Sequence, residues 1–478
     1  MCTCSDDPKD DLTPYIHYSL SRRDLLKQGA AVVGAGAAAL MAKAQVGAQA
    51  TRGPVALFWG GGGTDAAAAA VEAERQATSK TAGMKFKALV RHGTSLTTET
   101  LTLKPLHPLQ VVVRTQAVQT CYSSTGQMNT ANPVPNAVVT GHGGVGIVED
   151  VGSAVRRVKV GDQVIMATTP NCGVCGNCLA NRGDICLMRL PALVSATMSD
   201  NTPVFMTAPP MGPCGYSEIL LAEEDWVVPV FTKVSPSELS ILSCVGGTGL
   251  GLAMCRFPVD AGSDVAVFGL GPIGISAVQG ARIQGAKTIV GIDPIKYRRD
   301  LALKLGATHV LDPNVDKGND LINKIRALTP DVVPAGRRYA GERPAGPQFV
   351  FEAAGGTRYP VAANVEAPSD LTGVEALQQS YAAVRNGGFV RTCSIGQPQG
   401  SMVSFPAGQW SNGSKTHVPG NYAGVQGLRD LPRFVRLIEN GHFDAKSLIG
   451  QVFKGSQMRE ALEPMANRSA ITTVIDFT

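Results

Sequence analysis

Short apolar runs in the second half of the chain predict a buried parallel sheet. Each run is followed by turn-forming residues, as is typical of strands that helices cover on both faces. After the first run, Ile275 to Gln284 has the pattern of a helix. Strands that alternate with helices predict a doubly wound α/β fold. The four runs are Val265–Phe268, Thr288–Ile292, Phe349–Phe351 and Gly388–Val390.

The remaining patterned segments are less regular. Val111 to Val118 is strand-like and ends shortly before Cys121. The stretch from Pro330 to Pro347 is rich in Pro, Gly and Arg, and it predicts an extra surface loop. Its arginines could contact a phosphate, although we favour a solvated role for Arg337, Arg338 and Arg343.

The N-terminal region has the pattern of an export signal. Arg22 and Arg23 precede a weakly apolar run, Gly29 to Ala42, which is too short and too rich in glycine for a comfortable membrane-spanning helix. An arginine pair before such a run is typical of twin-arginine signals. Ala48-Gln49-Ala50 offers a cleavage site. We predict a signal peptide over residues 1–50 and a linker over 51–83, with an uncleaved anchor as the alternative.

Composition and charge narrow the class of protein. Among 478 residues, 44% are hydrophobic and 17% are charged, which indicates a globular protein with a sizeable core. The formal net charge is only +5 and no long basic run is present, so nucleic acid is not expected as a partner.

Four cysteines close together predict a metal site. Cys172, Cys175, Cys178 and Cys186 have the spacing C-x2-C-x2-C-x7-C. Short glycine-containing loops let successive sulfurs turn toward one tetrahedral centre, and four thiolates leave no open position. The pattern therefore favours a structural zinc ion over a disulfide framework. An iron–sulfur cluster is the competing interpretation, because it shares the cysteine spacing of two.

A glycine-rich turn follows the first buried strand directly. Gly269, Gly271 and Gly274 form G-x-G-x-x-G with a strand before it and a helix after it, which is typical of a dinucleotide site. The second strand ends at Asp293, where a carboxylate accepts hydrogen bonds from a ribose and repels a 2′-phosphate. NAD is therefore favoured over NADP. Nearby Arg298, with Lys296 and Arg299, keeps NADP open, and an N-cap role for Asp293 is the structural alternative.

Taken together, these motifs resemble the zinc-containing medium-chain alcohol dehydrogenase family, over about residues 84 to 478. The resemblance rests on the order of Cys121, His142, the four-cysteine segment, Cys244 and the glycine-rich turn. It implies a GroES-like, mainly β catalytic domain (84–245, with the structural zinc lobe at 172–186), a Rossmann domain (246–421) and a return to the catalytic domain (422–478). It further implies a catalytic zinc held by Cys121, His142 and Cys244, with Ser123 as the proton relay.

Several positions depart from the pattern of the family. Ser124 and Gly143 stand where second-sphere carboxylates are common, and Gly126 stands where many members have a relay histidine. Tyr122 and Thr472 replace arginines that usually hold the pyrophosphate. Thr168 replaces a residue of the substrate pocket that is often aromatic, which hints at a less apolar substrate.

The expected reaction is reversible hydride transfer between a zinc-bound alcohol or aldehyde and NAD, with two zinc ions per chain. Export to the periplasm or medium by the twin-arginine translocase is expected, or a cytoplasmic location if the signal does not function. Because free NAD is scarce outside the cytoplasm, a dismutase-type enzyme with tightly bound NAD is an alternative, as is a non-catalytic exported zinc- or ligand-binding protein. The resemblance implies a homodimer or homotetramer.

Overall fold

The computed structural model describes residues 79–478 apart from positions 129, 132, 188–192, 208–211, 334–335, 337–340, 394–396 and 399. The chain divides into two compact units, Met1–Ala56 and Leu57–Thr478. The predicted signal peptide, residues 1–50, and most of the predicted linker lie outside the described residues. Everything below concerns the second unit.

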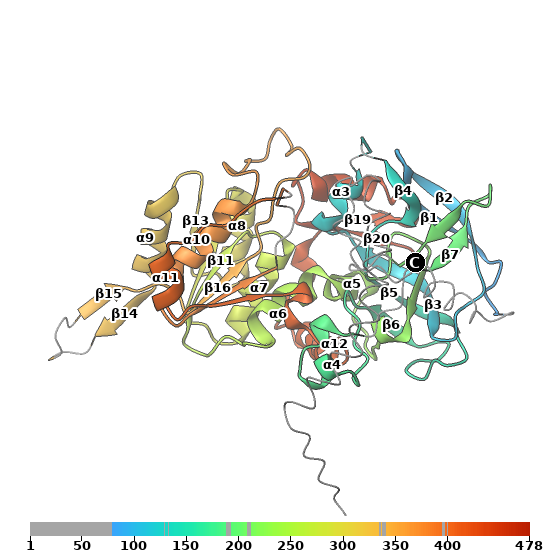
Figure 1. Cartoon of the computed structure of the whole chain (residues 1–478), viewed down its shortest axis with the longest axis horizontal. Coiled ribbons are helices and arrows are strands. Elements are labelled where there is room, and N and C mark those ends of the chain that lie inside the picture. The colour runs from blue at the N-terminus through green and yellow to red at the C-terminus, as the bar shows by residue number, and fades with distance from the viewer. Residues whose placement is uncertain are drawn as a thin grey trace, which may run out of the picture. The chain divides into compact units, whose positions relative to one another are not determined.

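The first part of this unit is built mainly from antiparallel strands, with β4–β8 and β19–β20 as parallel pairs, and we call it the barrel lobe (Figure 1). A small closed barrel has the strand order β1-β2-β7-β8-β4, and beside it a sheet has the order β10-β6-β5-β3-β20-β19, with β9 also paired to β3. The barrel strands are β1 (Lys85–Gly93), β2 (Ser95–Leu103), β4 (Val134–Val139), β7 (Val194–Thr197) and β8 (Pro203–Phe205). The sheet strands are β3 (Gln110–Gln119), β5 (Gly144–Val151), β6 (Gln163–Met166), β9 (Ile219–Glu223), β10 (Val227–Pro229), β19 (Ile449–Lys454) and β20 (Thr472–Asp476).

The second part, which we call the parallel-sheet lobe, confirms the expected doubly wound fold. Its strand order is β13-β12-β11-β16-β17-β18, and every pair is parallel. This is the order of a dinucleotide-binding sheet, in which the first strand lies in the middle. The strands are β11 (Asp264–Phe268), β12 (Thr288–Ile292), β13 (His309–Leu311), β16 (Phe349–Glu352), β17 (Phe389–Thr392) and β18 (Thr416–Pro419).

Alternating side chains of β11 explain why helices cover both faces of this sheet. Val265 and Val267 pack into the same core as α6 and α7, whereas Ala266 and Phe268 pack into a second core with α9 and α10. The helices of the lobe are α6 (Val245–Met254), α7 (Pro272–Ile283), α8 (Lys296–Leu305), α9 (Gly318–Leu328), α10 (Val374–Ala383) and α11 (Ala407–Asn412).

The two lobes meet along α5 (Pro236–Ser243), α6 and α12 (Gly427–Glu439). The chain leaves the barrel lobe through α5, and it returns after β18, because β20 pairs with β3. Among the described residues, no single helix is long and apolar enough to cross a membrane. The bent pair α5–α6 reaches the required length and composition only when its two halves are taken together, and both halves are largely buried here.

The segment from Pro330 to Pro347 differs from its prediction as an irregular loop. It forms a two-stranded antiparallel hairpin, β14 (Pro330–Val333) and β15 (Gly341–Pro344), which projects from the parallel-sheet lobe (Figure 1). Its composition concealed the strands, because proline and glycine are depleted in strands elsewhere. At the base of the hairpin, Arg385 Nη1 pairs with Asp331 Oδ1 at 2.7 Å.

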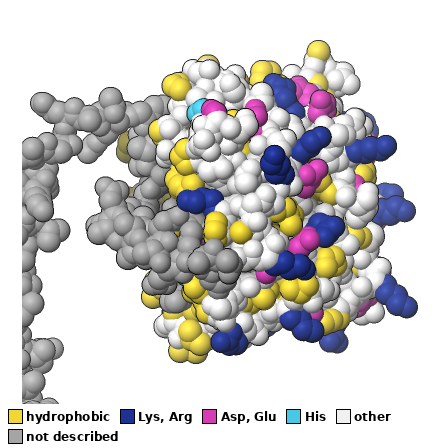
Figure 2. Space-filling model, turned by 90° about the vertical axis from the view of Figure 1, so that its right-hand side faces the viewer, with side chains coloured by type: hydrophobic (Ala, Val, Ile, Leu, Met, Phe, Trp, Pro, Cys, Tyr) yellow, Lys and Arg dark blue, Asp and Glu magenta, His cyan; other side chains and the backbone are white. Residues whose placement is uncertain are grey.

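The surface charge is mixed on the face that Figure 2 shows. Lysine and arginine side chains lie singly among uncharged groups or beside acidic ones on this side of the barrel lobe (Figure 2). Such interspersed charge lacks the continuous basic stripe that tracks a phosphate backbone.

Candidate active site

The four clustered cysteines converge on one point in a small excursion of the barrel lobe. Cys178 lies in α4 (Gly176–Leu179), and Cys186 follows a short 3-10 helix, Gly183–Ile185. Cys172 Sγ lies 3.9 Å from Cys178 Sγ, and Cys175 Sγ lies 3.9 Å from Cys186 Sγ. Two sulfurs on a tetrahedral zinc ion with bonds of about 2.3 Å are separated by about 3.8 Å, so the four thiols fit one ion.

This geometry separates the alternatives that the sequence left open. All four ligand atoms lie within 4.8 Å of one another, which leaves room for a single ion rather than a multi-iron cluster. The sulfurs are also much farther apart than the roughly 2 Å of a disulfide. The backbone N–H groups of Leu187 and Cys178 lower the pKa of the Cys175 thiol to about 6, which favours the thiolate that binds metal.

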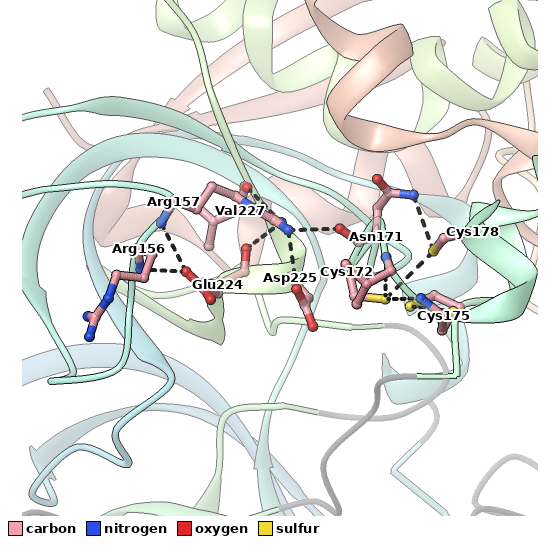
Figure 3. A network of polar contacts seen from close by, with 11 residues as sticks. Arg156, Arg157, Asn171, Cys172, Cys175, Cys178, Glu224, Asp225 and Val227 are labelled. Carbon is pink, nitrogen blue, oxygen red and sulfur yellow. Dashed lines mark hydrogen bonds and ion pairs between the residues drawn. The ribbon is translucent and has the colours of Figure 1, made fainter. Parts of the chain in front are cut away.

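Arg157 connects the start of the four-cysteine segment to the residues just before β10 (Figure 3). Its Nη2 donates to the carbonyl oxygen of Asn171 at 2.9 Å and pairs with Asp225 Oδ1 at 3.2 Å. Asn171 Nδ2 in turn approaches Cys178 Sγ at 3.6 Å. One guanidinium thus connects the residues beside β10 to the residue that precedes the first cysteine ligand.

A second ligand group, Cys121, His142 and Cys244, lies between the two lobes. Cys121 follows β3, His142 lies in the loop between β4 and β5, and Cys244 lies at the break between α5 and α6. The three side chains are buried. Cys244 Sγ is 3.8 Å from Cys121 Sγ and 3.1 Å from His142 Nε2. Three ligands on one side of a cleft leave the fourth tetrahedral position open, which is the arrangement of a catalytic zinc.

The two cysteines of this group differ in acidity. A hydrogen bond from the Cys244 thiol holds the pKa of Cys121 well below its usual range, and His142 acts in the same direction against burial. That same contact, together with burial, raises the pKa of Cys244. Cys121 is therefore the thiol that loses its proton first, and a divalent cation supplies the charge that both thiolates need.

Hydroxyl groups, rather than the carboxylates that are common in the family that the sequence resembles, surround the three ligands Cys121, His142 and Cys244. Tyr216 Oη accepts a hydrogen bond from the Cys121 N–H at 3.3 Å and donates to Ser124 Oγ at 3.1 Å. A side chain at Gly143 is excluded, because a Cβ there would lie 2.6 Å from Ser243 Oγ and the φ of Gly143 is +71°. Ser243 Oγ itself donates to Gln119 Oε1 at 2.7 Å.

Ser123 and Thr168 line the same cleft of about 270 Å³ as the three metal ligands. The Oγ of Ser123 is buried, acts on the Cys121 thiol by lowering its pKa, and has no further hydrogen-bond partner within the part of the chain that the structure describes. A buried hydroxyl with unused hydrogen-bonding capacity beside a metal ligand is the kind of group that a bound substrate satisfies.

The glycine-rich turn lies on the opposite wall of this cleft and fits a dinucleotide. Gly269 and Gly271 line the cleft, and Gly271 is followed at once by α7, whose N-terminus favours a phosphate. A Cβ on Gly274 would lie 1.8 Å from the carbonyl oxygen of Gly269, so only glycine lets the helix pack this close to the strand. Gly271 faces open space: a Cβ built on it would have Arg298 Nη1, at 3.9 Å, as its nearest neighbour.

Asp293 lies in the cleft at the end of β12 but already has backbone partners. Its Oδ2 accepts from Leu270 N–H at 2.7 Å, and its Oδ1 accepts from Ile295 N–H at 2.8 Å. The N-cap of α8 is Ile295, not Asp293. The structural role of Asp293 is therefore to stabilise the turn before this helix rather than to cap the helix. Arg298 Nη1 lies 3.8 Å from Oδ2, and each carboxylate oxygen keeps a lone pair toward the cleft.

Sequence reasoning missed Arg468 in this cleft. The residue is 8% exposed and has a φ of +65°, which is rare outside glycine. Its guanidinium lies 5.4 Å from the centre of the Tyr122 ring, and its Nη2 donates to Thr357 Oγ1 at 2.8 Å. The signal in the sequence was slight: one arginine between two turn-forming residues, Asn467 and Ser469. Tyr122, which replaces an arginine expected from the resemblance, thus lies beside another arginine, Arg468.

Comparisons with known proteins agree with this site. Residues 107–232 match the model of the alcohol dehydrogenase GroES-like domain, and residues 272–439 match that of the zinc-binding dehydrogenase family. Geraniol dehydrogenase of Castellaniella defragrans is 36% identical over 46% of this chain and 60% of its own length. Alcohol dehydrogenase 6 of Peromyscus maniculatus is 31% identical over 56% of this chain and 71% of its own length.

The fold has close counterparts among solved structures. Benzyl alcohol dehydrogenase of Acinetobacter calcoaceticus superimposes with a TM-score of 0.67 at 24% identity, over 82% of this chain and 99% of that chain. At this identity the similarity is evidence for the fold alone. The fold is a GroES-like domain joined to a Rossmann-type parallel sheet, as the sequence predicted.

Proposed function

The chain belongs to the zinc-containing medium-chain alcohol dehydrogenase family and is a zinc-dependent, NAD(P)-linked alcohol dehydrogenase, and from this premise we propose that it uses NAD and relays the substrate proton through Ser123. One observation carries the proposal: the open ligand group and the glycine-rich turn line the same cleft. A zinc ion held by Cys121, His142 and Cys244 supplies Lewis acidity to the oxygen of an alcohol or aldehyde.

The residues of this chain do the remaining work around that oxygen. Ser123 Oγ, buried beside Cys121, accepts the hydroxyl proton of an alcohol as the hydride leaves and gives up its own proton in turn. The turn from Gly269 to Gly274 and the N-terminus of α7 hold the pyrophosphate, which fixes the nicotinamide in the cleft. Thr168 lines the wall of the cleft, and it favours a substrate with a polar group over a simple aliphatic alcohol.

Asp293 supports NAD over NADP. Its buried carboxylate faces the cleft at the end of β12, where it repels the 2′-phosphate of NADP. Arg298 acts in the opposite direction, because its Nη1 lies 3.8 Å from Asp293 Oδ2 and its positive charge attracts a 2′-phosphate. Asp293 Oδ2 also accepts from Leu270 N–H at 2.7 Å, so the carboxylate is held in place at the end of β12.

Steady-state kinetics of the zinc-loaded chain tests both points. We expect reduction of NAD by primary alcohols, with a higher kcat/KM for NAD than for NADP. The substitution Asp293→Asn keeps the acceptor for the Leu270 N–H, gives up the one for the Ile295 N–H and removes the charge. It is expected to reduce the preference for NAD over NADP about tenfold or more. Ser123→Ala should lower kcat by about 10²-fold or more. A chain that binds two zinc ions and reduces neither nucleotide would overturn the proposal in favour of a non-catalytic binding protein.

A further inference from the structure

The metal ligand Cys244 lies at a sharp bend in the chain, where α5 ends and α6 begins (Figure 1). The two helices are bent by 57° relative to each other. Cys244 itself is not helical, with a φ of −142° and a ψ of −80°. A break of this kind leaves the last carbonyl groups of the first helix without partners inside that helix. The position of Cys244 therefore depends on what binds these carbonyl groups.

The hydroxyl of Tyr422 binds one of these carbonyl groups. It donates to the carbonyl oxygen of Leu242, two residues before the ligand, at 2.7 Å and across 180 positions of sequence. Tyr422 is only 5% exposed. Losing a hydrogen bond that is shielded from solvent leaves a buried carbonyl group unsatisfied, which is costly. Tyr422 therefore fixes the end of the helix that leads into Cys244.

Gly247, in the first turn of α6, leaves the space in which this hydrogen bond forms. A Cβ on Gly247 would lie 2.4 Å from the carbonyl oxygen of Leu242 and 2.7 Å from Tyr422 Oη. Both separations are shorter than van der Waals contact, so a larger residue would push the hydroxyl and the carbonyl apart. The helices on the two sides of Cys244 thus both pack around one tyrosine hydroxyl.

The backbone at Tyr422 has an unfavourable conformation that its surroundings hold in place. Tyr422 and Ala423 have φ values of 51° and 49°, in the left-handed region that residues other than glycine rarely adopt. Two such residues in succession persist only where the surrounding structure fixes them. Here Arg391 Nη2 donates to the carbonyl oxygen of Ala423 at 2.8 Å. Because Arg391 lies on β17, the turn that carries Tyr422 is fastened to the parallel sheet.

Tyr422 also lies on the wall of the nucleotide cleft. Tyr422 and Gly420 line this cleft together with Cys244 and the glycine-rich turn. Gly420 directly follows β18, the last strand of the parallel sheet. A nucleotide on the glycine-rich turn therefore shares its cleft with the residue that holds the bend at Cys244.

We propose that Tyr422 is a positioning residue for Cys244, and that through it a nucleotide in the cleft sets the place of this ligand relative to Cys121 and His142. The inference goes beyond the function proposed above and rests on that function only for the nucleotide in the cleft. Cys121 and His142 belong to the barrel lobe, whereas Tyr422 is fastened to the parallel sheet. A movement of the sheet on nucleotide binding thus reaches one of the three metal ligands and not the other two.

The test observes the metal site without turnover, on the full chain with cobalt in place of zinc at the open ligand group. We expect NADH to change the visible cobalt spectrum of the wild type when no alcohol or aldehyde is present. In Tyr422→Phe, which keeps the ring and removes only the hydroxyl, this change should be largely lost at saturating NADH. A chelator should also remove cobalt from this variant about tenfold faster or more, because the carbonyl of Leu242 has lost its partner.

Two further variants separate positioning from a general loss of stability. Gly247→Ala keeps the tyrosine and pushes its hydroxyl away from the carbonyl of Leu242, so it should reproduce both effects. Tyr359→Phe is the matched control, because it removes a different tyrosine hydroxyl, which donates to Glu463 Oε2 at 2.8 Å. It should behave as the wild type does. Zinc content at the four-cysteine site and far-ultraviolet circular dichroism establish that each variant is folded.

Failure of this inference is distinguishable from failure of the proposed function. If NADH binds to the wild type by titration but leaves its cobalt spectrum unchanged, the inference is overturned, while the zinc-loaded chain still oxidises alcohols. If Tyr422→Phe matches Tyr359→Phe both in its response to NADH and in its rate of cobalt loss, the inference is again overturned. A wild-type chain that binds no NADH would contradict the proposed function, and this inference with it.

Discussion

Tyr216 holds the backbone next to a metal ligand in a part of the site that lacks carboxylates. Its ring is completely buried, and its hydroxyl lies between the N–H of Cys121 and Ser124 Oγ. Carboxylates near a metal-binding histidine raise its basicity and orient it. A neutral hydroxyl supplies orientation only, so this site depends on geometry more than on added negative charge.

Removing that hydroxyl should weaken the catalytic metal site. Tyr216→Phe leaves the Cys121 N–H and Ser124 Oγ without their partner, at a cost of about 1–3 kcal/mol. We expect zinc affinity at the open site to fall about tenfold or more, measured by chelator competition, and the visible spectrum of the cobalt-substituted site to change. Ser124→Ala, which removes only the acceptor, should have a smaller effect. Unchanged affinity and an unchanged cobalt spectrum in Tyr216→Phe would show that the hydroxyl does not position the ligand.

Arg468 offers a second prediction at this scale, because it is a buried cation held toward the nucleotide cleft. A non-glycine residue at a φ of +65° carries a backbone cost of about 1–2 kcal/mol, which indicates that the side chain contributes something in return. We expect it to contact the pyrophosphate in the place of the arginines absent at Tyr122 and Thr472.

The substitution Arg468→Met tests this role by isothermal titration with NAD after removal of bound nucleotide. Loss of a charged hydrogen bond of about 1.5–3 kcal/mol predicts a Kd about tenfold to a hundredfold higher. Arg459→Met, an exposed arginine in the same C-terminal segment, is the control and should bind NAD as the wild type does. Equal Kd values for the two variants would rule out a contact between Arg468 and the nucleotide.

At the scale of single elements, β9 ends in a carboxyl group that is unfavourable when charged. Burial raises the pKa of Glu223 to about 7 from an ordinary value of 4.5. The folded state therefore binds a proton more tightly than the unfolded state between these two values. The resulting stabilisation is complete below about pH 4.5 and is lost as the pH rises through about 7.

Glu223→Gln should remove this dependence on pH. Urea unfolding is measured at pH 5.5 and pH 8 for both proteins. Between these two pH values the free energy of unfolding of the wild type should fall by about 1–3 kcal/mol more than that of the variant. Taking the difference between wild type and variant cancels the effect of pH on the zinc ligands, which both proteins share. Parallel pH profiles for the two proteins would mean that Glu223 titrates normally.

The elements also show how far the sequence alone reaches. The metal groups and the glycine-rich turn could be predicted, because their chemistry depends on short spacings or on strong local patterns. Tyr216 could not, since it meets Cys121 across 95 positions. The segment 356–373, between β16 and α10, is composed like any exposed loop, and only its contacts with Asn314 and Tyr122 distinguish it. The hairpin β14–β15 was missed because local composition opposed strands that pairing stabilises.

At the scale of the whole molecule, the reaction needs both lobes. The barrel lobe contributes Cys121 and His142, the parallel-sheet lobe contributes the glycine-rich turn, and Cys244 lies at the junction. The segment 356–373 forms hydrogen bonds with both lobes. A chain cut at the junction would leave neither half with a complete site. Association into dimers or tetramers stays a prediction.

The predicted export signal is consistent with this chemistry, because the six cysteines of the two ligand groups would be oxidised as free thiols outside the cytoplasm, whereas zinc protects them. The twin-arginine route carries folded proteins, so zinc is expected to bind first. Replacing Arg22 and Arg23 by lysine should keep the chain in the cytoplasm, with unchanged zinc content. The wild type should appear in the exported fraction with about two zinc ions per chain and begin at Thr51 by N-terminal sequencing, and its six ligand cysteines should be modified by a thiol reagent only after zinc is removed. Wild-type protein that remains cytoplasmic with residues 1–50 intact would show that this segment is not a working signal, and free NAD would then be available to the enzyme without a retained nucleotide.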